Sequence, residues 1–394
     1  MNNKNILISG AGIAGTSLAF WLKKFGFNPT IIEISPKLRQ GGYAIDFMGA
    51  GYDVAEKMGI TPALEKVDLN ISKLSFVNSK DEEVGSMNYR KVKELMNNRA
   101  LTLLRSDLAG VIYNNLHKDT EIIFGDTINE IEQDEEKVMV TFKSGLKRSF
   151  DLVVGADGLH SNVRKLVFGP EVQFEKYYGF YTSSFTIDNF AYKGRAFSMY
   201  NAPYKQVAIY SDGKNKTITF FIFTSPEKLS YGHHDIARQK QILKDEFMNA
   251  GWKCPEVLSK IDSTTDFYFD SISQIHMQNW SKGRVTLVGD AGYCPSLLSG
   301  KGSTLAIVGA YILAGELKEA NGNYETAFQQ YQNIFKPFMN KKQKAAQAFA
   351  KSFVPKSHFG IWLRNRVFNL MSLPFIARLL FNQFKDKGLI LKDY

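Results

Sequence analysis

Residues 5–15, Asn-Ile-Leu-Ile-Ser-Gly-Ala-Gly-Ile-Ala-Gly, decide the fold of the N-terminal part of the chain. The apolar run 5–9 predicts a short buried strand, and a helical pattern follows over residues 16–25. A second apolar run, 29–32, ends in an acid at Glu33. This order of strand, glycine turn, helix and strand is typical of a dinucleotide-binding α/β unit.

Each glycine of the turn has a separate role in such a unit. Gly10 permits the tight turn, Gly12 lets the backbone approach a pyrophosphate, and Gly15 lets helix and strand pack closely. Ala14 belongs to the same phosphate-binding segment, whose helix N-terminus offers free N–H groups to an anion. Glu33 follows Gly10 at roughly the 20-residue distance expected of the acid that binds ribose hydroxyls. Since a carboxylate there repels a 2′-phosphate, FAD or NAD is favoured over NADP.

Two later motifs extend this unit. Residues 151–164 read Asp-Leu-Val-Val-Gly-Ala-Asp-Gly-Leu-His-Ser-Asn-Val-Arg, a buried strand that runs into a turn and a helix. Residues 283–295 form a second strand that ends in Gly-Asp, and a glycine pair and an apolar helix over 305–317 follow. Asp290 therefore lies at the carboxyl end of a strand, where open α/β sheets bind ligands.

Taken together, these motifs resemble the single-component flavin-dependent aromatic hydroxylases, the group of para-hydroxybenzoate hydroxylase. The resemblance covers roughly residues 4–335 and rests on GxGxxG…E, DGxxSxxR and GDA…P with the glycine pair. A closer likeness, to the tetracycline destructases, rests on Gly-Asp-Ala-Gly-Tyr-Cys-Pro at 289–295 and on the sequences 40–46 and 308–317. It also rests on a helical extension at the C-terminus.

The resemblance implies a role for each matching residue. Glu33 would hold the adenosine ribose, Arg105 would contact the FAD chain, and Asp290 would bind its ribityl or pyrophosphate part. Asp157 and Arg164 would bridge cofactor and fold, and Arg39 and Asp46 match positions that contact nicotinamide and flavin. The cofactor-binding residues are then Gly10, Gly12, Ala14, Gly15, Glu33, Arg39, Asp46, Arg105, Asp157, Arg164, Asp290, Pro295, Gly300 and Gly302. Without the resemblance, Arg105 reads as a surface arginine and Asp46 as the end of a strand.

The chain departs from the family pattern at four positions. Gly292 and Tyr293 replace the usual Ala and His, Lys301 replaces Gln, and Thr304 replaces Asn. These changes put in doubt the redox tuning of the flavin and any proton role of the missing His. The group Asp157, His160 and Ser161 is no hydrolase triad, because the three lie within five residues and no GxSxG elbow is present.

The middle of the chain predicts a substrate-binding sheet. Residues 177–226 alternate with period two and are rich in aromatic side chains, which predicts about four strands. Most of these aromatics are expected in the core, but a flat polycyclic substrate is best held by aromatic faces. The candidates for the substrate pocket are Phe180, Tyr200, Phe221 and Phe223.

Only one GxGxxG is present, which argues against a separate nicotinamide domain. The resemblance implies that NADPH or NADH visits transiently and reduces FAD, that O2 adds to form a C4a-hydroperoxide, and that its distal oxygen attacks the substrate. No protein side chain is then required as a catalytic residue, because the flavin carries the chemistry. The two cysteines and the His spacing predict neither disulfides nor a metal site.

The basic charge belongs to the C-terminal tail. Residues 335–394 hold twelve Lys/Arg against two Asp/Glu, which equals the net charge of +10 of the whole chain. The remaining residues are neutral, so a nucleic-acid partner is not expected. Helices are predicted from about 341 to 352, from 357 to 370 and from 374 to 388. They could pack on the body, which we favour, cover the active site as a lid, or bind a membrane surface.

We therefore expect an α/β fold with a Rossmann-like FAD-binding domain (1–75, 100–172 and 277–335), an interleaved mixed-sheet substrate domain (76–99 and 173–276) and a helical appendage (336–394). The expected protein is a cytoplasmic monomer without stable membrane insertion. Its expected function is NAD(P)H- and O2-dependent hydroxylation and inactivation of tetracyclines, small polycyclic aromatic molecules. The alternatives are a hydroxylase of another aromatic or polyketide metabolite, and a non-catalytic flavoprotein or membrane-surface binding module.

Overall fold

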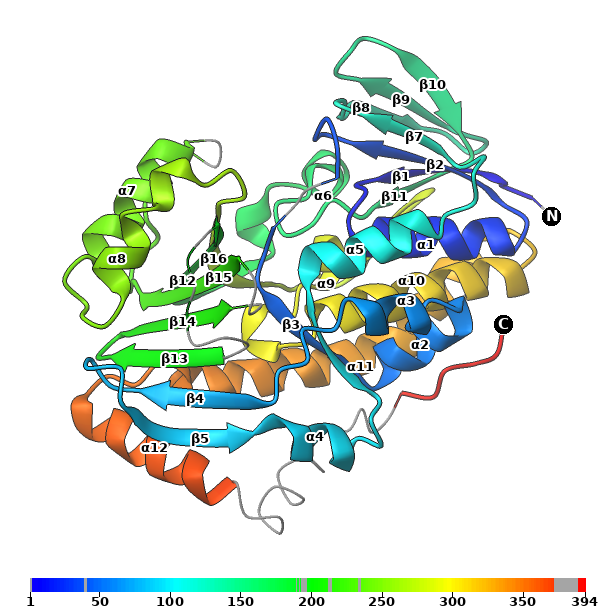
Figure 1. Ribbon diagram of the computed structural model, residues 1–394. Helices are drawn as coiled ribbons and strands as arrows, with labels where there is room; N and C mark the ends of the chain where they lie inside the picture. The colour runs from blue at the N-terminus through cyan, green and yellow to red at the C-terminus, as the bar shows by residue number, and fades with distance from the viewer. Residues whose placement is uncertain are drawn as a thin grey trace.

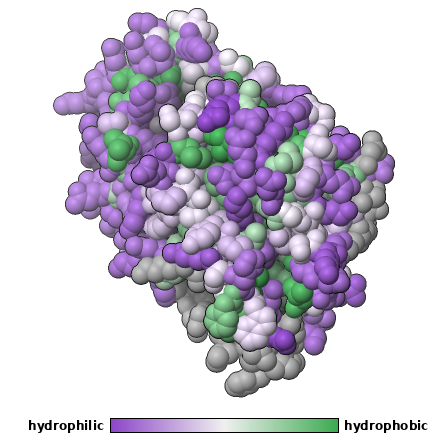
Figure 2. Space-filling model, turned by 90° about the vertical axis from the view of Figure 1, so that its left-hand side faces the viewer, coloured by the Kyte–Doolittle hydropathy of each residue, from purple (hydrophilic) through white to green (hydrophobic). Residues whose placement is uncertain are grey.

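The structure is a computed structural model that describes residues 2–38, 41–188, 190, 192, 197–211, 215–232, 235–371 and 389–394. The chain forms two large sheets and a group of helices that lie around a common centre (Figure 1). Within the described ranges, no helix has the length and apolar character that crossing a membrane requires. The face of the molecule in Figure 2 is mostly hydrophilic, with hydrophobic groups scattered between polar ones.

A six-stranded sheet carries the glycine turn. Its strands, in spatial order, are β17 (Ser281–Lys282), β18 (Val285–Leu287), β11 (Leu152–Gly155), β1 (Asn5–Ser9), β2 (Asn28–Glu33) and β7 (Glu121–Phe124). All neighbours pair in parallel except β17 and β18. The strands predicted at 5–9 and 29–32 are thus confirmed, and the strands of the two later motifs lie beside β1 as a parallel sheet requires.

Helices cover one face of this sheet and a small sheet covers the other (Figure 1). The helical layer contains α1 (Ile13–Lys24), α2 (Ala50–Met58), α3 (Thr61–Lys66), α5 (Arg105–Asn114) and α10 (Gly302–Glu319). The small sheet consists of β8 (Ile128–Gln133), β9 (Val138–Phe142) and β10 (Lys147–Phe150). The central strand β1 is buried between the two layers, so its residues 6–8 are all apolar and fully covered.

A seven-stranded sheet forms the other half of the molecule. Its strands, in spatial order, are β16 (Tyr268–Ile275), β12 (Glu175–Asp188), β15 (Lys216–Thr224), β14 (Lys205–Ser211), β13 (Phe197–Ala202), β4 (Lys73–Val77) and β5 (Glu83–Asn88). Only β13 and β4 pair in parallel. The strands predicted between 177 and 226 are confirmed as β12 to β15. α7 (Ile236–Phe247) and α8 (Cys254–Leu258) pack on one face of this sheet through an aromatic core.

Short elements connect the two halves. They are β3 (Ala44–Met48) paired with β6 (Ala100–Leu104), α4 (Tyr89–Leu95), α6 (Asn162–Val167), α9 (Asp290–Tyr293) and the 3₁₀ turns η1 (Glu171–Gln173), η2 (Ile261–Ser263) and η3 (Leu297–Ser299). Of these, β3 and α9 lie between the two halves, whereas α4 lies beside β5 at the edge of the seven-stranded sheet (Figure 1).

The C-terminal part is helical, as predicted, but its first helix is longer. α11 (Tyr324–Phe353) contains Pro337 and begins well before the predicted start near 341. It ends before Pro355, and Ser357 accepts the N–H of Gly360 at the start of α12 (His358–Met371). The helix predicted at 374–388, and with it the proposed lid, lies outside the described residues.

The described end of the tail packs on the body. The Tyr394 ring lies so close to Gly315 that a Cβ there would come within 2.2 Å of it. The Tyr394 hydroxyl and the Lys392 ammonium both donate to the buried Glu316 carboxylate, at 2.7 and 2.6 Å. For residues 389–394, the interpretation of the tail as a packed appendage agrees with the structure.

Candidate active site

The glycine turn between β1 and α1 has the geometry that the sequence predicts. Gly10 has φ of +107°, and a Cβ on it would lie 2.6 Å from the carbonyl oxygen of Ala156. A Cβ on Gly15 would lie 1.9 Å from the Gly10 oxygen, so strand and helix pack in contact there. A Cβ on Gly12 would meet nothing within 4 Å. The turn is therefore closed toward the fold and open at Gly12, where a phosphate can approach the backbone.

Glu33 is held beside this turn. Its carboxylate accepts the N–H of Ala11 at 2.8 Å and that of Ser35 at 3.0 Å. The first bond fixes the carboxylate at the carboxyl end of β2, next to the glycine turn. Because a carboxylate has about four acceptor sites, capacity for ribose hydroxyls remains.

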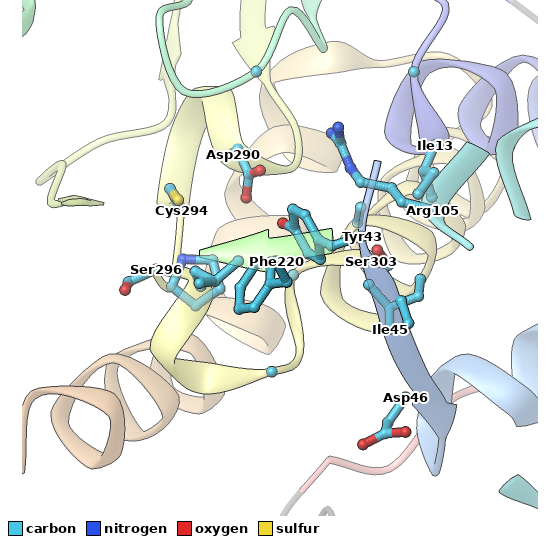
Figure 3. A pocket seen from close by; sticks show the side chains of 18 of the residues that line it. Ile13, Tyr43, Ile45, Asp46, Arg105, Phe220, Asp290, Cys294, Ser296 and Ser303 are labelled. Atoms are coloured by element: carbon cyan, nitrogen blue, oxygen red, sulfur yellow. The ribbon is translucent and has the colours of Figure 1, made fainter. Parts of the chain in front are cut away.

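A pocket of about 340 Å³ lies between the glycine turn and the free face of the seven-stranded sheet (Figure 3). Both halves of the molecule contribute to it. The wall from the first half consists of Gly12, Ile13, Ala14, Tyr43, Ala44, Ile45, Asp46, Arg105, Ala156, Gly158, Asp290, Cys294, Pro295, Ser296, Leu297, Gly300, Gly302, Ser303 and Ala306. The other wall consists of Phe197, Met199, Gln206, Ala208, Tyr210, Ile218 and Phe220, with Phe353 from α11.

Arg105 and Asp290 place opposite charges on the first wall. Arg105 begins α5, and its backbone N–H donates to the Tyr43 carbonyl at 3.2 Å. Burial opposes its charge, but Tyr43, Tyr268 and Asp290 together raise the pKa of Arg105 above its ordinary value. Burial raises the pKa of Asp290, which Arg105 partly offsets. The pocket thus holds a permanently charged guanidinium suited to a phosphate or a polar chain.

Tyr43, which the sequence reasoning missed, stands between the two walls. Its ring lies 5.4 Å from that of Phe220 and 6.0 Å from that of Tyr268, measured between centroids. Burial raises its pKa to about 12, so its hydroxyl keeps its proton at neutral pH. Figure 3 shows Tyr43 and Phe220 side by side at the centre of the pocket. An aromatic residue following two glycines was the signal that could have identified it.

Asp46 lies on β3 at the other end of the first wall. The hydroxyls of Tyr89 and Thr102 both donate to its carboxylate, the second at 3.2 Å. The side chain is exposed and lines the pocket, and partial desolvation by the protein around it raises its pKa. Asp46 is therefore held in place as a pocket residue rather than only ending a strand.

The start of α10 lines the pocket with backbone. Gly300 has φ of +60° and, like Gly12, would place a Cβ in open space. Gly300, Gly302 and Pro295 all line the pocket, and the buried hydroxyl of Thr304 has no partner among the described residues. The N-terminus of this long helix favours a ligand that carries negative charge.

Asp157 and Arg164 lie beneath the pocket rather than in its wall. The Asp157 carboxylate accepts the Ser161 hydroxyl and the Val163 N–H, which closes the turn before α6. Arg164 is fully buried and donates to the carbonyls of Ala291 and Leu159 and to Glu171. Both residues therefore support the turn whose Ala156 and Gly158 face the pocket. Arg39 lies outside the described residues.

His160 and Ser161 have other partners than a hydrolase would need. His160 bridges Glu171 and Asp270, at 3.0 and 3.1 Å, and Ser161 donates to Asp157. No hydrogen bond joins His160 to the Ser161 hydroxyl among the described residues, in agreement with the sequence interpretation.

The predicted substrate-pocket aromatics are corrected by the structure. Phe221 and Phe223 are fully buried in the core under α7 and α8, and the Tyr200 hydroxyl donates to the Ala250 carbonyl away from the pocket. Phe180 packs in a cluster with α11 beside the pocket. Alternation along β15 turns Phe220, not its neighbours, toward the pocket. The sequence shows the alternation but not which of its two faces meets the other half.

Tyr293 also faces away from the pocket. Its hydroxyl accepts the Tyr331 hydroxyl at 2.9 Å and lies against Gly309, where a Cβ would come within 2.0 Å. Its ring lies 4.5 Å from that of Trp280. The residue that replaces the usual His is thus a packing contact between α9, α10 and α11, and no proton role at the pocket belongs to it.

The known proteins that this chain resembles agree with a dinucleotide-binding pocket of this kind. A model of the FAD binding domain family matches residues 3–341. The chain belongs to this family. A flavin-dependent monooxygenase of Legionella longbeachae is 38% identical over 360 residues, which cover 90% of each chain. An uncharacterised protein of Mycobacterium tuberculosis is 39% identical over 86% of this chain and 92% of its own.

Among solved structures, that of tetracycline destructase Tet(55) superposes with a TM-score of 0.85 and 34% identity, covering 100% of this chain and 99% of that one. Tetracycline destructase Tet(51) gives 0.85 and 33%, with 99% of each chain covered. The chain is thus an FAD-dependent monooxygenase of the family that includes these proteins. The fold class and the enzyme prediction are confirmed, and the non-catalytic alternative is set aside.

The residues present fit FAD. The open position at Gly12, the N-terminus of α1 and the bound Glu33 suit the adenosine diphosphate part. Arg105 and Asp290 lie along the pocket toward Gly300 and Gly302, which leave room for a flat ring against the backbone. The aromatic wall of the seven-stranded sheet faces this position across the pocket.

Proposed function

We propose that this FAD-dependent monooxygenase uses NADPH or NADH and O2 to hydroxylate and thereby inactivate tetracyclines. The observation that carries the proposal is the pocket, in which a dinucleotide-binding wall faces an apolar and aromatic wall across one cavity. The 34% identity to Tet(55) over the whole chain supports the substrate class. A polycyclic substrate fits a wall of this kind, which offers aromatic faces and few polar anchors.

The cofactor would be held by its two ends. Gly12, the α1 N-terminus and Glu33 would bind the phosphates and the adenosine ribose, and Arg105 and Asp290 would bind the chain that leads to the ring. Gly300, Gly302 and the N-terminus of α10 would contact the ring through backbone. When bound, FAD supplies hydride acceptance from the nicotinamide and the activation of dioxygen.

The chain's own residues position the substrate and exclude water. Phe197, Met199, Tyr210 and Phe220 form an apolar surface against which a flat molecule can lie. Orientation of this kind raises the rate because the reacting atoms start within reach of each other. The same surface keeps water away from the reacting centre. No acid–base side chain needs to act, because the flavin carries the chemistry.

The test begins with the colour and spectrum of the purified protein. Bound flavin should give a yellow protein, or should bind when FAD is added. NADPH and NADH consumption is then measured with and without tetracycline, together with the near-ultraviolet absorbance of the drug. The proposal expects drug-dependent consumption and loss of that absorbance, with a product one oxygen atom heavier by mass spectrometry.

Consumption that yields only hydrogen peroxide and leaves the drug unchanged would overturn the tetracycline assignment. That result would favour a hydroxylase of another aromatic or polyketide metabolite. A protein that neither contains nor binds FAD would overturn the function as a whole.

A further inference from the structure

The pocket face of the seven-stranded sheet is a grid of side chains. Opposite residues in neighbouring strands share a face, so β13, β14 and β15 form three rows there. The rows are Phe197–Tyr210–Ile218, Met199–Ala208–Phe220 and Asn201–Gln206–Ile222. The first two rows are apolar apart from the Tyr210 hydroxyl, which donates to the Leu69 carbonyl at 3.0 Å. The third row differs, because two of its three side chains are amides.

Within the described residues, no side-chain hydrogen bond satisfies either of these two amides. Asn201 is 8% exposed and Gln206 is 5% exposed, and Gln206 lines the pocket. The Asn201 Oδ1 atom is buried without a partner. Gln206 makes no side-chain hydrogen bond within the described part of the chain. A buried amide without partners is unfavourable, so Gln206 in the pocket wall, with Asn201 opposite it in β13, points to a ligand that completes their hydrogen bonds.

Arg364 brings a positive charge to the same face of the sheet. Its guanidinium lies 5.6 Å from the ring of Phe76, which is opposite Met199 in the register of β4 and β13. α12 packs against β5 and β13. The chain leading into α12 is tied to the hairpin between Asn201 and Gln206, because the Tyr204 N–H donates to the Pro355 carbonyl at 2.9 Å.

The charge of Arg364 is not balanced by any acid in the described part of the chain. Its Nε and Nη2 atoms are buried and have no hydrogen-bond partner there. Burial lowers its pKa to about 10, so it remains charged at neutral pH. Buried charges in proteins are normally paired, and a guanidinium pairs best with a planar anion.

We propose that Asn201, Gln206 and Arg364 form a subsite that binds a negatively charged, carbonyl-bearing edge of the substrate. The apolar rows then hold the ring system, and the third row with Arg364 fixes which end of the molecule points away from the flavin. This inference rests on the proposed function in one respect, that the pocket is the substrate pocket. It goes further by naming the chemistry that selects and orients the ligand.

A matched pair of ligands tests the subsite without tetracycline. 2-Naphthoate and 2-naphthamide have the same rings, but only the first carries a charge. Their dissociation constants are measured by titration calorimetry with the FAD-loaded protein. We expect the wild type to bind the anion more tightly than the amide. Arg364→Gln should raise the dissociation constant of 2-naphthoate at least tenfold and change that of 2-naphthamide less than twofold. Arg364→Lys should restore part of the preference.

Two further variants separate recognition from folding. Arg366→Gln removes an exposed arginine of the same helix, which lies over Trp362, and should leave both constants unchanged. Gln206→Met keeps the size of the side chain and should weaken both ligands severalfold. Equal weakening of both ligands by Arg364→Gln, or no anion preference in the wild type, would overturn the proposal.

Tetracycline turnover by the same preparations keeps the two proposals apart. In one outcome, the wild type fails to act on tetracycline, and the Arg364→Gln variant loses the preference for the anion that the wild type has. In that case the subsite stands and the tetracycline assignment fails. If tetracycline is consumed and Arg364→Gln leaves both its KM and the naphthoate affinity unchanged, the assignment stands and the subsite is wrong.

Discussion

The guanidinium of Arg164 donates a 2.9 Å hydrogen bond to the carbonyl of Ala291, although 127 residues separate them in the chain. Arg164 belongs to the turn and helix after β11, and Ala291 follows Asp290 after β18. One buried side chain therefore holds together two motifs that the sequence shows only as separate segments. Both motifs supply backbone or side chains to the pocket wall.

Replacement of Arg164 should destabilise the fold. Arg164→Met leaves the carbonyls of Ala291 and Leu159 without this donor and leaves Glu171 with His160 as its remaining partner. Because Glu171 is partly exposed, the loss should lie below the roughly 3–5 kcal/mol of a fully buried ion pair, at about 2–3 kcal/mol. Chemical denaturation followed by circular dichroism measures the free energy of unfolding. Lys165→Met, an exposed neighbour, serves as the control. A loss no larger than that of the control would contradict the role of Arg164 as a tie between the motifs.

Two variants of the glycine turn should have separate effects, one on the affinity for FAD and the other on the stability of the fold. Gly12→Val should weaken FAD binding more than tenfold with little change in stability, because its side chain would occupy the open position. Gly15→Ala should instead lower stability, because its Cβ would overlap the Gly10 oxygen. Flavin fluorescence titration and thermal unfolding give the two readouts. Gly110→Ala, where a Cβ meets nothing within 4 Å, is the control. Unchanged FAD affinity in Gly12→Val would contradict a phosphate site there.

Two adjacent phenylalanines test which face of β15 lies against the pocket. Phe221→Ala should destabilise the protein by about 3–5 kcal/mol, the usual loss for a fully buried phenylalanine. Phe220→Ala should cost less stability, because its ring faces the pocket, but should raise the KM for the substrate. Steady-state kinetics and denaturant unfolding of both variants provide the measurements. The reverse pattern would place Phe221 in the substrate wall.

His160 should make stability depend on pH. Burial lowers the pKa of its imidazole, but the bonds to Asp270 and Glu171 outweigh this and raise the pKa from 6.5 to about 10. Since the folded pKa is the higher one, the stabilisation is fully present below pH 6.5. It is lost as the pH rises from 6.5 through about 10. The difference in unfolding free energy between wild type and His160→Gln should therefore shrink over that range.

This pH dependence is measured by denaturant unfolding of both proteins at several pH values between 6 and 10. His117→Gln, at an exposed histidine, is the matched control variant. A difference between wild type and His160→Gln that stays constant over this range would mean that the charged pair does not stabilise the fold.

Local patterns predicted the dinucleotide fold well. The strands at 5–9 and 29–32, the glycine turn and the acid Glu33 all depend on neighbouring residues, and the structure has them as expected. The sequence predicted a helix only from about residue 341, whereas α11 begins at Tyr324 and contains Pro337. In the structure that proline lies inside a helix packed on α10.

The sequence by itself determined the glycine turn, the succession of strand, turn, helix and strand along the chain, and the alternation of the middle strands, because backbone conformation and side-chain period are local properties. Only the tertiary structure decided that Phe220 rather than Phe221 faces the pocket, and that Arg164 supports the pocket instead of lining it. Only the tertiary structure, too, brought Arg364 over Phe76. Each of these depends on which distant surface a face packs against, and no local pattern contains that information.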